Sequence, residues 1–368
     1  MLLKECCFLV KDKIDTNKLN KFNYISTENL NPNFNGFTEA SSLPCGKVTK
    51  IQSGDILISN IRPYFKKGLF CCFDGGCSND VFCIRNSSDS YINKYLYYAL
   101  CSDYFINKLV MSCKGTKMPR GDKNVLLNYY LPDICIEKQQ HIVNILGSID
   151  DKIENNEQII ASCEDYLKIY YQLLVHKSLH TGSIKIKDVF DIIDNRGKTP
   201  PLVNHKTKYP IIDIRTLSSD NRNVLYENVT KYVNQDTYNT WFRSGHPQKF
   251  DILLSTVGTI GSMKLFNTSN GCIAQNVVAF RCKNKYPLFY YQQMKYIQND
   301  LISYDIGSVQ PSIKISQIDK HELLILEEKD MESFENIAKL ITEKIFNLYN
   351  VNNKLQELKQ TYLKRFFG

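Results

Sequence analysis

The stretch GDILIS, residues 54–59, returns later in the chain as FDILLS, residues 250–255, at an offset of 196 residues. The same offset aligns SNDVFCIR, residues 78–85, with AQNVVAFR, residues 274–281. Three further pairs of segments keep this order at offsets of 192 or 196: YLYY with PLFY (95–98 and 287–290), KGTKMP with IGSVQP (114–119 and 306–311), and DYLKIYY with TYLKRFF (165–171 and 361–367). Each match is weak alone, but their common order and nearly constant offset indicate a tandem duplication.

Both copies follow one plan of predicted elements. A β-rich stretch comes first, because DILISNI and DILLSTV are largely apolar runs with glycine and asparagine around them. A helix follows, for which SSDS (87–90) offers caps in the first copy and Pro287 suits the first turn in the second. A glycine-containing loop, a short strand and a long helix complete each copy. The loops are predicted at 115–122 and 307–312, and the short strands at 126–131 and 322–326.

The long helices carry the clearest periodicity. Alternate steps of four and three residues give an almost entirely apolar seam in the first helix: Ile142, Leu146, Ile149, Ile153, Asn156, Ile160, Cys163, Leu167, Tyr170 and Leu174. The second helix gives Ile341, Ile345, Leu348, Asn352, Leu355, Leu358 and Tyr362. This spacing is typical of a coiled coil, in which a buried asparagine sets register or orientation. The alternative is that Asn156 and Asn352 are only partly buried. We predict an antiparallel pair of helices joining two globular heads.

The composition is that of an ordinary globular protein with a basic excess. The chain has 368 residues, 43% of them apolar, which suits two or three domains with sizeable cores. A formal net charge of +8 weakly favours a polyanionic partner. No run of 18 apolar residues occurs, and Met1–Val10 contains two charges, so we expect neither a membrane span nor a signal peptide. The 13 cysteines include no CxxC pair, which predicts free thiols in a reducing cytoplasm and no metal site.

Motifs of catalytic sites are incomplete in this sequence. NPNF (31–34) is similar to the Asn-Pro-Pro-aromatic loop of adenine methyltransferases, but the second proline and a glycine-rich cofactor turn are missing. PDICIEK (132–138) is similar to a nuclease motif, but its Glu and Lys are adjacent, and we interpret it as a strand edge. His176 and His180 have a spacing that suits a metal ion, but they also suit a solvated helix end. KTP (198–200) lacks the P-loop pattern. We expect no catalytic residue and no cofactor.

Two related but divergent heads on a stiff spacer suit a bipartite, asymmetric target. Double-stranded DNA is the natural candidate, because the spacing between half-sites on a duplex is a geometric quantity. A helix of about 40 residues is roughly 60 Å long, which exceeds one turn of DNA, about 34 Å.

Four segments in a fixed order carry a resemblance to a known family. GDILIS, KGTKMPR, LPDICIEKQQHIVNILGSIDDKIENN and RGKTPP resemble recurrent segments of the specificity subunit of type I restriction–modification systems. The order of parts is similar to that family over nearly the whole chain. The family's proline followed by Glu-Gln, before the first long helix, is partly kept as Pro132, Glu137 and Gln139, whereas LEEKDMESF in the second copy loses the pattern.

The resemblance implies an α+β chain in which two tandem α/β target-recognition domains are separated by long helices that pair as an antiparallel coiled coil. The implied boundaries are 1–136 and 183–330 for the two recognition domains, and 137–182 and 331–368 for the central and C-terminal spacer helices. Each domain would read one half-site. Two modification subunits would bind around the spacer and carry the adenine methyltransferase chemistry, and restriction subunits, with motor and nuclease, would join for cleavage. The chain itself would be a non-catalytic subunit in the cytoplasm.

The candidate site residues are therefore DNA-binding residues on loops. In the first head the loops 60–67 and 114–120 gather cations beside an aromatic ring, and the candidates are Asn60, Arg62, Tyr64, Lys66, Lys67, Lys114, Thr116, Lys117 and Arg120. In the second head the candidates are Arg196, Lys198, Thr199, Thr256, Thr259, Gln275, Asn276, Ser308 and Gln310. Lysine and arginine neutralise phosphates, whereas arginine, asparagine and glutamine read base edges. The alternative for each residue is an ordinary basic or polar surface loop.

Two other functions compete with DNA recognition. A coiled-coil scaffold with protein-binding heads would have the same long helices, but basic glycine loops at the same place in both copies favour DNA. An enzyme that cuts or methylates alone would need the cofactor and nuclease motifs that this sequence lacks.

Overall fold

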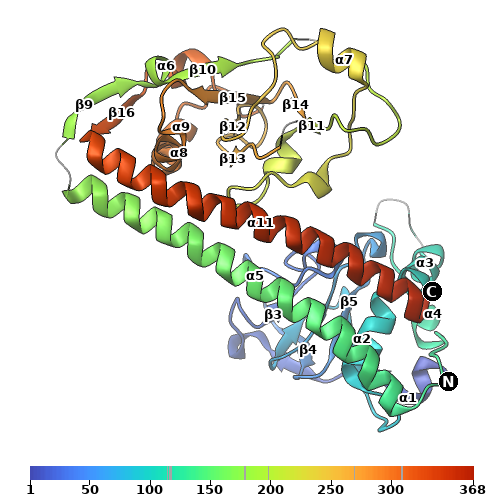
Figure 1. Cartoon of the computed structure of the whole chain (residues 1–368). Helices are drawn as coiled ribbons and strands as arrows, with labels where there is room; N and C mark the ends of the chain where they lie inside the picture. Colours follow the sequence, from blue (N-terminus) through green and yellow to red (C-terminus); the bar gives the residue numbers. More distant parts are fainter. Residues whose placement is uncertain (114, 116–117, 178–179, 198, 269, 308–309) are drawn as a thin grey trace. The chain divides into compact units, whose positions relative to one another are not determined.

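The computed structural model describes residues 1–113, 115, 118–177, 180–197, 199–268, 270–307 and 310–368. The chain forms two compact units, Met1–Ile153 with Asn353–Gly368, and Glu154–Asn352. Two long helices, α5 (Ile136–Lys177) and α11 (Glu328–Phe367), each contribute residues to both units (Figure 1). Each unit also contains one copy of the repeat, which we call the first and second head.

The first head is built on two four-stranded sheets, ordered β1-β8-β5-β6 and β2-β4-β7-β3 among the described residues. The strands are β1 (Cys7–Leu9), β2 (Lys13–Asp15), β3 (Tyr24–Ile25), β4 (Lys47–Ile51), β5 (Ile56–Ser59), β6 (Gly68–Phe70), β7 (Gly75–Cys77) and β8 (Val81–Asn86). The helices are α1 (Leu3–Cys6), α2 (Asn93–Cys101), α3 (Asp103–Met111) and α4 (Lys123–Leu127), with short 3-10 turns at Thr16–Lys18, Pro32–Phe34 and Pro63–Phe65.

The second head repeats the first sheet as β10-β15-β12-β13 and adds two-stranded sheets β11-β14 and β16-β9. Its strands are β9 (His180–Lys185), β10 (Phe190–Ile193), β11 (Ile211–Ile212), β12 (Ile252–Ser255), β13 (Met263–Leu265), β14 (Cys272–Ile273), β15 (Val277–Cys282) and β16 (Glu322–Leu326). Its helices are α6 (Ile186–Val189), α7 (Gln235–Thr240), α8 (Pro287–Tyr296), α9 (Gln298–Ile302) and α10 (Ile315–Ile318), with 3-10 turns at Ile214–Leu217 and Tyr226–Asn228.

In the repeated four-stranded sheet, successive side chains of a strand point to opposite faces, and each face packs into a different core. In β5, Ile56 and Ile58 join the core that contains α2, α3 and the long helices, whereas Leu57 joins the core under the second sheet. In β12, Ile252 and Leu254 likewise face the long helices and Leu253 faces the opposite core. The apolar runs that the sequence repeats are therefore strands that are buried on both faces.

An ion pair between a partly exposed arginine and a buried aspartate occupies the same place in both heads and confirms the duplication. Arg85 Nε lies 2.7 Å from Asp55 Oδ1, and Arg281 Nη2 lies 2.8 Å from Asp251 Oδ2. Each carboxylate also accepts the backbone N–H of the residue three positions earlier, at 2.8 Å for Asp55 and 2.7 Å for Asp251. Because both partners are repeated at an offset of 196 residues, the GDILIS and FDILLS stretches hold equivalent positions.

The long helices pair in opposite directions within each unit, as Figure 1 shows. In the second unit, Leu167 and Tyr171 from late in α5 share a core with Phe334 and Ala338 from early in α11. In the first unit, the early part of α5 shares a core with the end of α11, including Leu363 and Phe367. The predicted antiparallel coiled coil is confirmed, and both Asn156 (0% exposed) and Asn352 (8% exposed) are buried in it.

The predicted seam fails near the end of α11. Leu358 is 42% exposed, whereas Lys359 is 6% exposed. Lys359 Nζ lies 2.5 Å from Asp150 Oδ1 on α5, and the buried apolar positions become Leu363 and Phe367. The shift has a physical cause, because these last turns pack against the first head as well as α5, and Phe367 contacts the ring of Tyr95.

One of the two predicted short strands is wrong. Residues 322–326 form β16 and pair with β9, as expected for a strand. In the first head, α4 covers Lys123–Leu127, and Tyr130 makes only an isolated bridge with Leu2. At this place Leu2 is the bridge partner of Tyr130.

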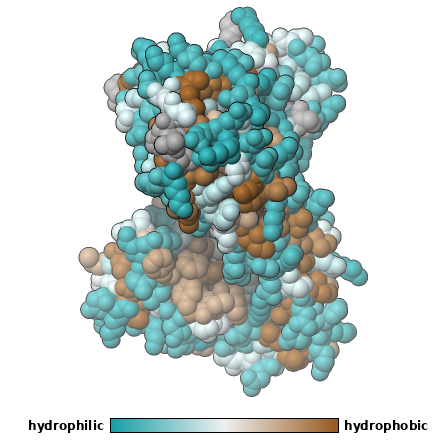
Figure 2. Space-filling view, turned by 60° about the vertical axis from the view of Figure 1, so that its left-hand side comes forward, coloured by the Kyte–Doolittle hydropathy of each residue, from teal (hydrophilic) through white to brown (hydrophobic). Residues whose placement is uncertain are grey.

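The 13 cysteines all lie within the described residues and are free thiols. Among the helices of the described ranges, none is long and apolar enough to span a membrane. Nor does any group of three or more His, Cys, Asp and Glu side chains in the described part of the chain suit a metal ion. Figure 2 shows a face on which hydrophilic residues predominate and hydrophobic residues gather in smaller patches.

Candidate nucleic-acid interface

In the first head, the two loops that we predict to bind DNA are joined by backbone hydrogen bonds. The N–H of Arg62 donates to the carbonyl oxygen of Pro119 at 2.8 Å, and the N–H of Gly121 donates to that of Asn60 at 3.0 Å. Ile61 and Arg120 form an antiparallel bridge between these bonds. Segments about 60 residues apart therefore present their side chains from one clamped backbone.

The second head has the same arrangement of two loops joined by backbone hydrogen bonds, which we call the clamp, at the equivalent residues. The N–H of Gly258 donates to the carbonyl oxygen of Pro311 at 2.9 Å, and the N–H of Ile313 donates to that of Thr256 at 2.9 Å. Val257 and Ser312 form the bridge. The backbone frame is thus common to both heads. Pro119 and Pro311 are identical, whereas Arg62 and Arg120 are replaced by Gly258 and Ser312.

A third segment joins each clamp. The N–H of Asn60 donates to the carbonyl oxygen of Asp80 at 2.8 Å, and that of Thr256 donates to Asn276 at 2.9 Å. In the second head Gln275 Nε2 also donates to the carbonyl oxygen of Gly197 at 3.1 Å. These bonds bring together the predicted segments 195–200, 255–261, 274–276 and 307–312.

The backbone of Arg62 is strained in a way that its counterpart is not. Arg62 has φ 48° and ψ 59°, which lie in the left-handed region. Gly258, at the equivalent place, has φ 85° and tolerates this conformation without a side-chain clash. A non-glycine residue there costs about 1 kcal/mol, and such strain gathers at binding loops. The arginine is therefore kept at a position where the fold favours glycine.

The cations of the first head are held by specific partners. Lys66 Nζ lies 2.5 Å from Asp103 Oδ1, and Lys67 Nζ donates to the carbonyl oxygen of Thr27 at 2.7 Å. Burial lowers the pKa of Lys67. Tyr64 is 49% exposed beside Phe65, with 4.8 Å between ring centroids. An exposed aromatic pair between cations is suited to stacking and to backbone contacts with a nucleic acid.

The remaining candidates differ in their access to solvent. Arg196, Thr199, Thr259 and Gln310 are exposed, and Arg196 pairs with Asp194 at 2.7 Å. Thr256 is 0% exposed, so it shapes its loop and does not present its hydroxyl. The Oδ1 atoms of Asn60 and Asn276 are buried and have no hydrogen-bond partner among the described residues. Five candidates lie outside the described residues: Lys114, Thr116, Lys117, Lys198 and Ser308.

Each head also has a cleft beside its clamp that the sequence did not reveal. The first cleft, about 430 Å³, is lined by Ser26, Glu28, Glu39, Ser78 and Asp80 among others. The second cleft, about 320 Å³, is lined by Thr199, Asp213, Lys231, Gln275 and Asn276 among others. These residues come from separate loops, so no single stretch of the sequence marks either cleft. An acid two residues before an arginine occurs at 213–215, where Asp213 lines the second cleft, and also at 194–196.

Comparison with known proteins identifies a family match over most of the chain. Residues 3–165 and 181–361 match the family described as the type I restriction modification DNA specificity domain. No curated protein matches the chain.

Among solved structures, the type I restriction–modification S subunit from M. genitalium is similar at 15% identity. The match covers 100% of this chain and 95% of that one, with a TM-score of 0.60, and shows a shared fold. A chain from a study of complex assembly and conformational transition of the type I R-M system matches at 18% identity over 100% and 96% of the two chains, with a TM-score of 0.43. The HsdS subunit from Thermoanaerobacter tengcongensis matches at 19% identity over 100% and 95%, with a TM-score of 0.38.

Proposed function

Because this chain belongs to the type I restriction modification DNA specificity family, we propose that it is the non-catalytic subunit that recognises a bipartite, asymmetric DNA site. The first head, residues 1–136, reads one half-site, and the second head, residues 183–330, reads the other. The spacer helices, residues 137–182 and 331–368, set the distance between half-sites and bind two modification subunits. The modification subunits carry the adenine methyltransferase activity, and restriction subunits join them for cleavage.

The repeated clamp carries this proposal. The bond from Arg62 to Pro119 and the bond from Gly258 to Pro311 hold two loops together in the same way in both heads. A shared frame with divergent side chains is what two readers of unlike half-sites require. A protein scaffold has no comparable need for two equivalent polar loop clusters.

The chemistry of the two clusters suits different parts of DNA. In the first head we assign Arg62 and Arg120 to phosphate or guanine, because a forked guanidinium binds either. We assign Lys66 and Lys67 to phosphates, which would replace the contacts of these lysines with Asp103 and Thr27. In the second head, the amides of Gln275 and Gln310 suit base edges, because an amide offers a donor and an acceptor together. Phosphate contacts fix register, and base contacts specify sequence.

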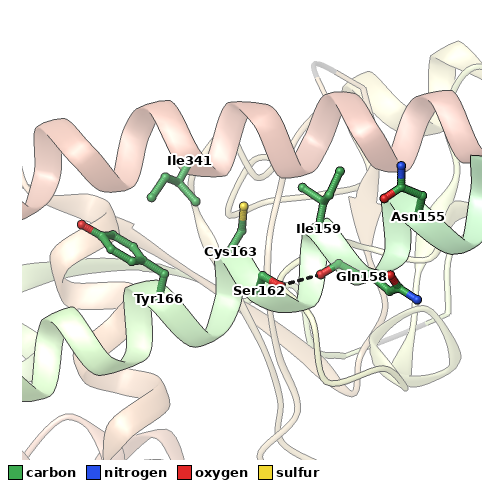
Figure 3. Close-up of a pocket in the computed structure, with 7 residues that line it drawn as sticks. All are labelled: Asn155, Gln158, Ile159, Ser162, Cys163, Tyr166 and Ile341. Atoms are coloured by element: carbon green, nitrogen blue, oxygen red, sulfur yellow. Dashed lines mark hydrogen bonds between the residues drawn. The ribbon is translucent and has the colours of Figure 1, made fainter.

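The long helices present an apolar face that suits the modification subunits. Tyr166, Ile169 and Leu173 on α5 are 50%, 55% and 47% exposed, and their spacing of three and four residues places them on one face. A groove beside them is lined by Ile159, Cys163 and Tyr166 of α5 and by Ile341 of α11, as Figure 3 shows. Exposed apolar residues of this kind are typical of protein interfaces.

Salt-dependent DNA binding tests recognition against the scaffold alternative. The chain, purified with the modification subunits of its own cell, is titrated onto duplex DNA in gel shifts between about 50 and 200 mM salt. Six or more phosphate contacts predict a loss of about 10³-fold or more in affinity over this range. Binding that is absent, or that does not respond to salt, would contradict DNA recognition. The purified chain alone is expected to transfer no labelled methyl group to DNA and to cut none.

Substitutions on α5 test the docking face separately. Ile169→Glu should prevent co-purification with the modification subunits, because a charge would be buried in the interface. Ala161→Glu places the same charge on an exposed position of α5 that faces another direction, and should leave co-purification unchanged. Equal recovery of the subunits with both variants would remove this face from the interface.

A further inference from the structure

The two clefts occupy equivalent places in the fold. In the first head β3 runs parallel to β7, with Tyr24 opposite Gly76 and Ile25 opposite Cys77. In the second head β11 runs parallel to β14, with Ile211 opposite Cys272 and Ile212 opposite Ile273. Each cleft is lined by residues that directly follow these strands, Ser26 and Ser78 in one case, Asp213 and Ala274 in the other. The carboxyl ends of parallel strands are a common position for ligand sites.

In the first head a carboxylate of the cleft holds an arginine. Asp80 lines the cleft, and its Oδ1 lies 2.9 Å from Arg120 Nη2. Both backbones are fixed by the clamp, since the carbonyl oxygen of Asp80 accepts the N–H of Asn60 and Arg120 forms a bridge with Ile61. The arginine side chain is 56% exposed, so the pair points a partly neutralised guanidinium toward solvent at the edge of the cleft.

In the second head the same arrangement is made from other residues. Asp213 lines the cleft, and Arg215 Nη2 lies 2.6 Å from its Oδ2. Nη2 also donates to Thr230 Oγ1 at 2.7 Å, and the N–H of Arg215 donates to Asp213 Oδ1 at 3.0 Å. The carboxylate is 10% exposed and the arginine 50% exposed. The guanidinium is therefore oriented by the carboxylate and the threonine hydroxyl, with its outer edge in solvent.

The two arginine pairs are not inherited from the duplication. At the place of Asp80 and Arg120 the second head has Asn276 and Ser312. At the place of Asp213 the first head has Ser26, which follows β3 as Asp213 follows β11. Each head thus has a carboxylate-held arginine at its cleft, but Asp80 lies between β7 and β8, whereas Asp213 directly follows β11. An exposed ion pair adds little to stability, so the recurrence points to a ligand.

We propose that Arg120 and Arg215 are the guanine-reading residues of the two heads, and that Asp80 and Asp213 are positioning residues that orient them. The inference rests on the proposed function and adds residues and a base identity to it. Arginine binds the O6 and N7 acceptors of guanine through two parallel hydrogen bonds in the major groove. A carboxylate that holds one side of the guanidinium limits its rotation and directs the other side outward.

The charge of the first cleft favours a base contact over a phosphate contact. Glu28 and Glu39 line it together with Asp80, so three carboxylates line the cleft that Arg120 contacts through Asp80. Carboxylates repel phosphates but accept hydrogen bonds from the N4 amino group of cytosine. A G·C pair therefore suits this cleft, with the guanine edge on Arg120 and the amino group of cytosine within reach of a carboxylate.

The test selects DNA from a pool and compares variants. The chain in complex with the modification subunits is mixed with duplexes that contain a randomised central region, and bound sequences are read. The wild type should enrich a bipartite motif with a G·C pair in each half. Arg120→Ala and Arg120→Lys should lower discrimination at one G·C pair of one half by about 10- to 100-fold, and Arg215→Ala should do so in the other half. Lys249→Ala removes an exposed cation paired with Glu343 and should leave the motif intact.

Asp80→Asn tests whether the Asp80 carboxylate acts by orienting the Arg120 side chain. It should relax the same G·C pair as Arg120→Ala, while affinity for random DNA is unchanged or higher because a negative charge is removed. If Arg120→Ala weakens binding to all sequences alike and reduces the salt slope by about one unit, the arginine contacts phosphate and the proposal fails. An unchanged motif with Asp80→Asn would also overturn it.

Two controls distinguish a loss of folding from a loss of DNA recognition. Thermal unfolding of each variant identifies any that fail to fold, and if Arg120→Ala is one of them, the more conservative Arg120→Lys and Asp80→Asn take its place in the selection. A wild type that enriches no bipartite motif would contradict the proposed function itself.

Discussion

Asn156 Nδ2 donates a hydrogen bond of 2.7 Å to Asn352 Oδ1, and the two residues are 196 positions apart, which is the offset of the repeat. Each copy of the duplicated module thus contributes the same position to one buried polar pair between α5 and α11. The neighbouring seam positions Ile153, Ile160 and Ile345 are buried and apolar. Sliding one helix past the other would place an amide against these residues, so the pair specifies the register.

A single substitution in this pair should cost more than a double one. Asn156→Leu leaves the Asn352 amide facing an apolar side chain, at a cost of about 1–3 kcal/mol in the free energy of unfolding. The double variant Asn156→Leu, Asn352→Leu should recover most of that loss. Urea unfolding of the wild type, Asn156→Leu, Asn352→Leu and the double variant gives the coupling energy. Asn155→Ala, at an exposed neighbouring position, serves as the control. Additive effects of the two substitutions would show that the pair does not act as a unit.

Arg222 should be a dominant contributor to the stability of the second unit. The residue is 1% exposed; its Nε and Nη2 donate to Glu164 on α5 at 2.9 and 2.7 Å, and its Nη1 donates to Thr342 on α11 at 2.5 Å. Arg222→Ala should cost about 3–5 kcal/mol, because it leaves Glu164 without its partner in a partly buried site. Lys249→Ala breaks an exposed pair and should cost less than about 1 kcal/mol. Similar unfolding midpoints for both variants would contradict this assignment.

Glu335 should make the second unit sensitive to pH. Its carboxylate accepts the N–H groups of Leu288 and Phe289 at the start of α8, at 3.0 and 2.9 Å. Burial raises the pKa of Glu335 to about 7, against the hydrogen bonds, which lower it. A folded-state pKa above the unfolded value of about 4.3 means that the folded protein binds the proton more tightly. Stability from this group is therefore present at low pH and is lost as pH rises from about 4 to about 7.

Glu335→Gln removes the titrating carboxyl group of Glu335. In the first unit, the equivalent residue Gln139 already accepts the N–H of Ile92 through its Oε1 at 2.9 Å. Glu335→Gln should stabilise the protein above pH 7 by about 1–2 kcal/mol, with a difference that shrinks toward pH 4. Thermal unfolding across pH 4–8 measures this, with Glu332→Gln, an exposed position on the same helix, as the control. A constant offset between wild type and Glu335→Gln at all pH values would refute the role of burial.

Insertions in α5 should change the spacing of the half-sites and not their identity. Four residues added near Asn156 lengthen the helix by about 6 Å and turn it by about 400°, so the seam keeps nearly the same face. The spacer between half-sites should grow by one to two base pairs, at about 3.4 Å each. Two added residues turn the seam by about 200° and should abolish assembly. An active four-residue variant with an unchanged spacer would leave the helices as docking surfaces only.

The fold was predictable because its signals are periodic. The repeat at 196 residues, the apolar runs of DILIS and DILLS and the seam around Asn156 are patterns in the sequence itself, and each is confirmed. The error at Leu358 arose because a head packs on the same turns of α11, which changes the buried face. Asp80 and Arg120 were missed as a pair because they are 40 residues apart and meet only through the clamp. The chemistry of the loops is set by tertiary contacts that periodicity does not encode.

Exchange of one head tests whether each head reads its own half-site. Residues 183–330 are replaced by the corresponding segment of another family member, the hybrid is expressed with the modification subunits, and methylated bases are mapped across the host genome. If the heads are independent readers, the hybrid methylates a site with a new sequence in one half, and the other half-site and the spacer length are kept. A hybrid that is active but changes both half-sites, or neither, would contradict it.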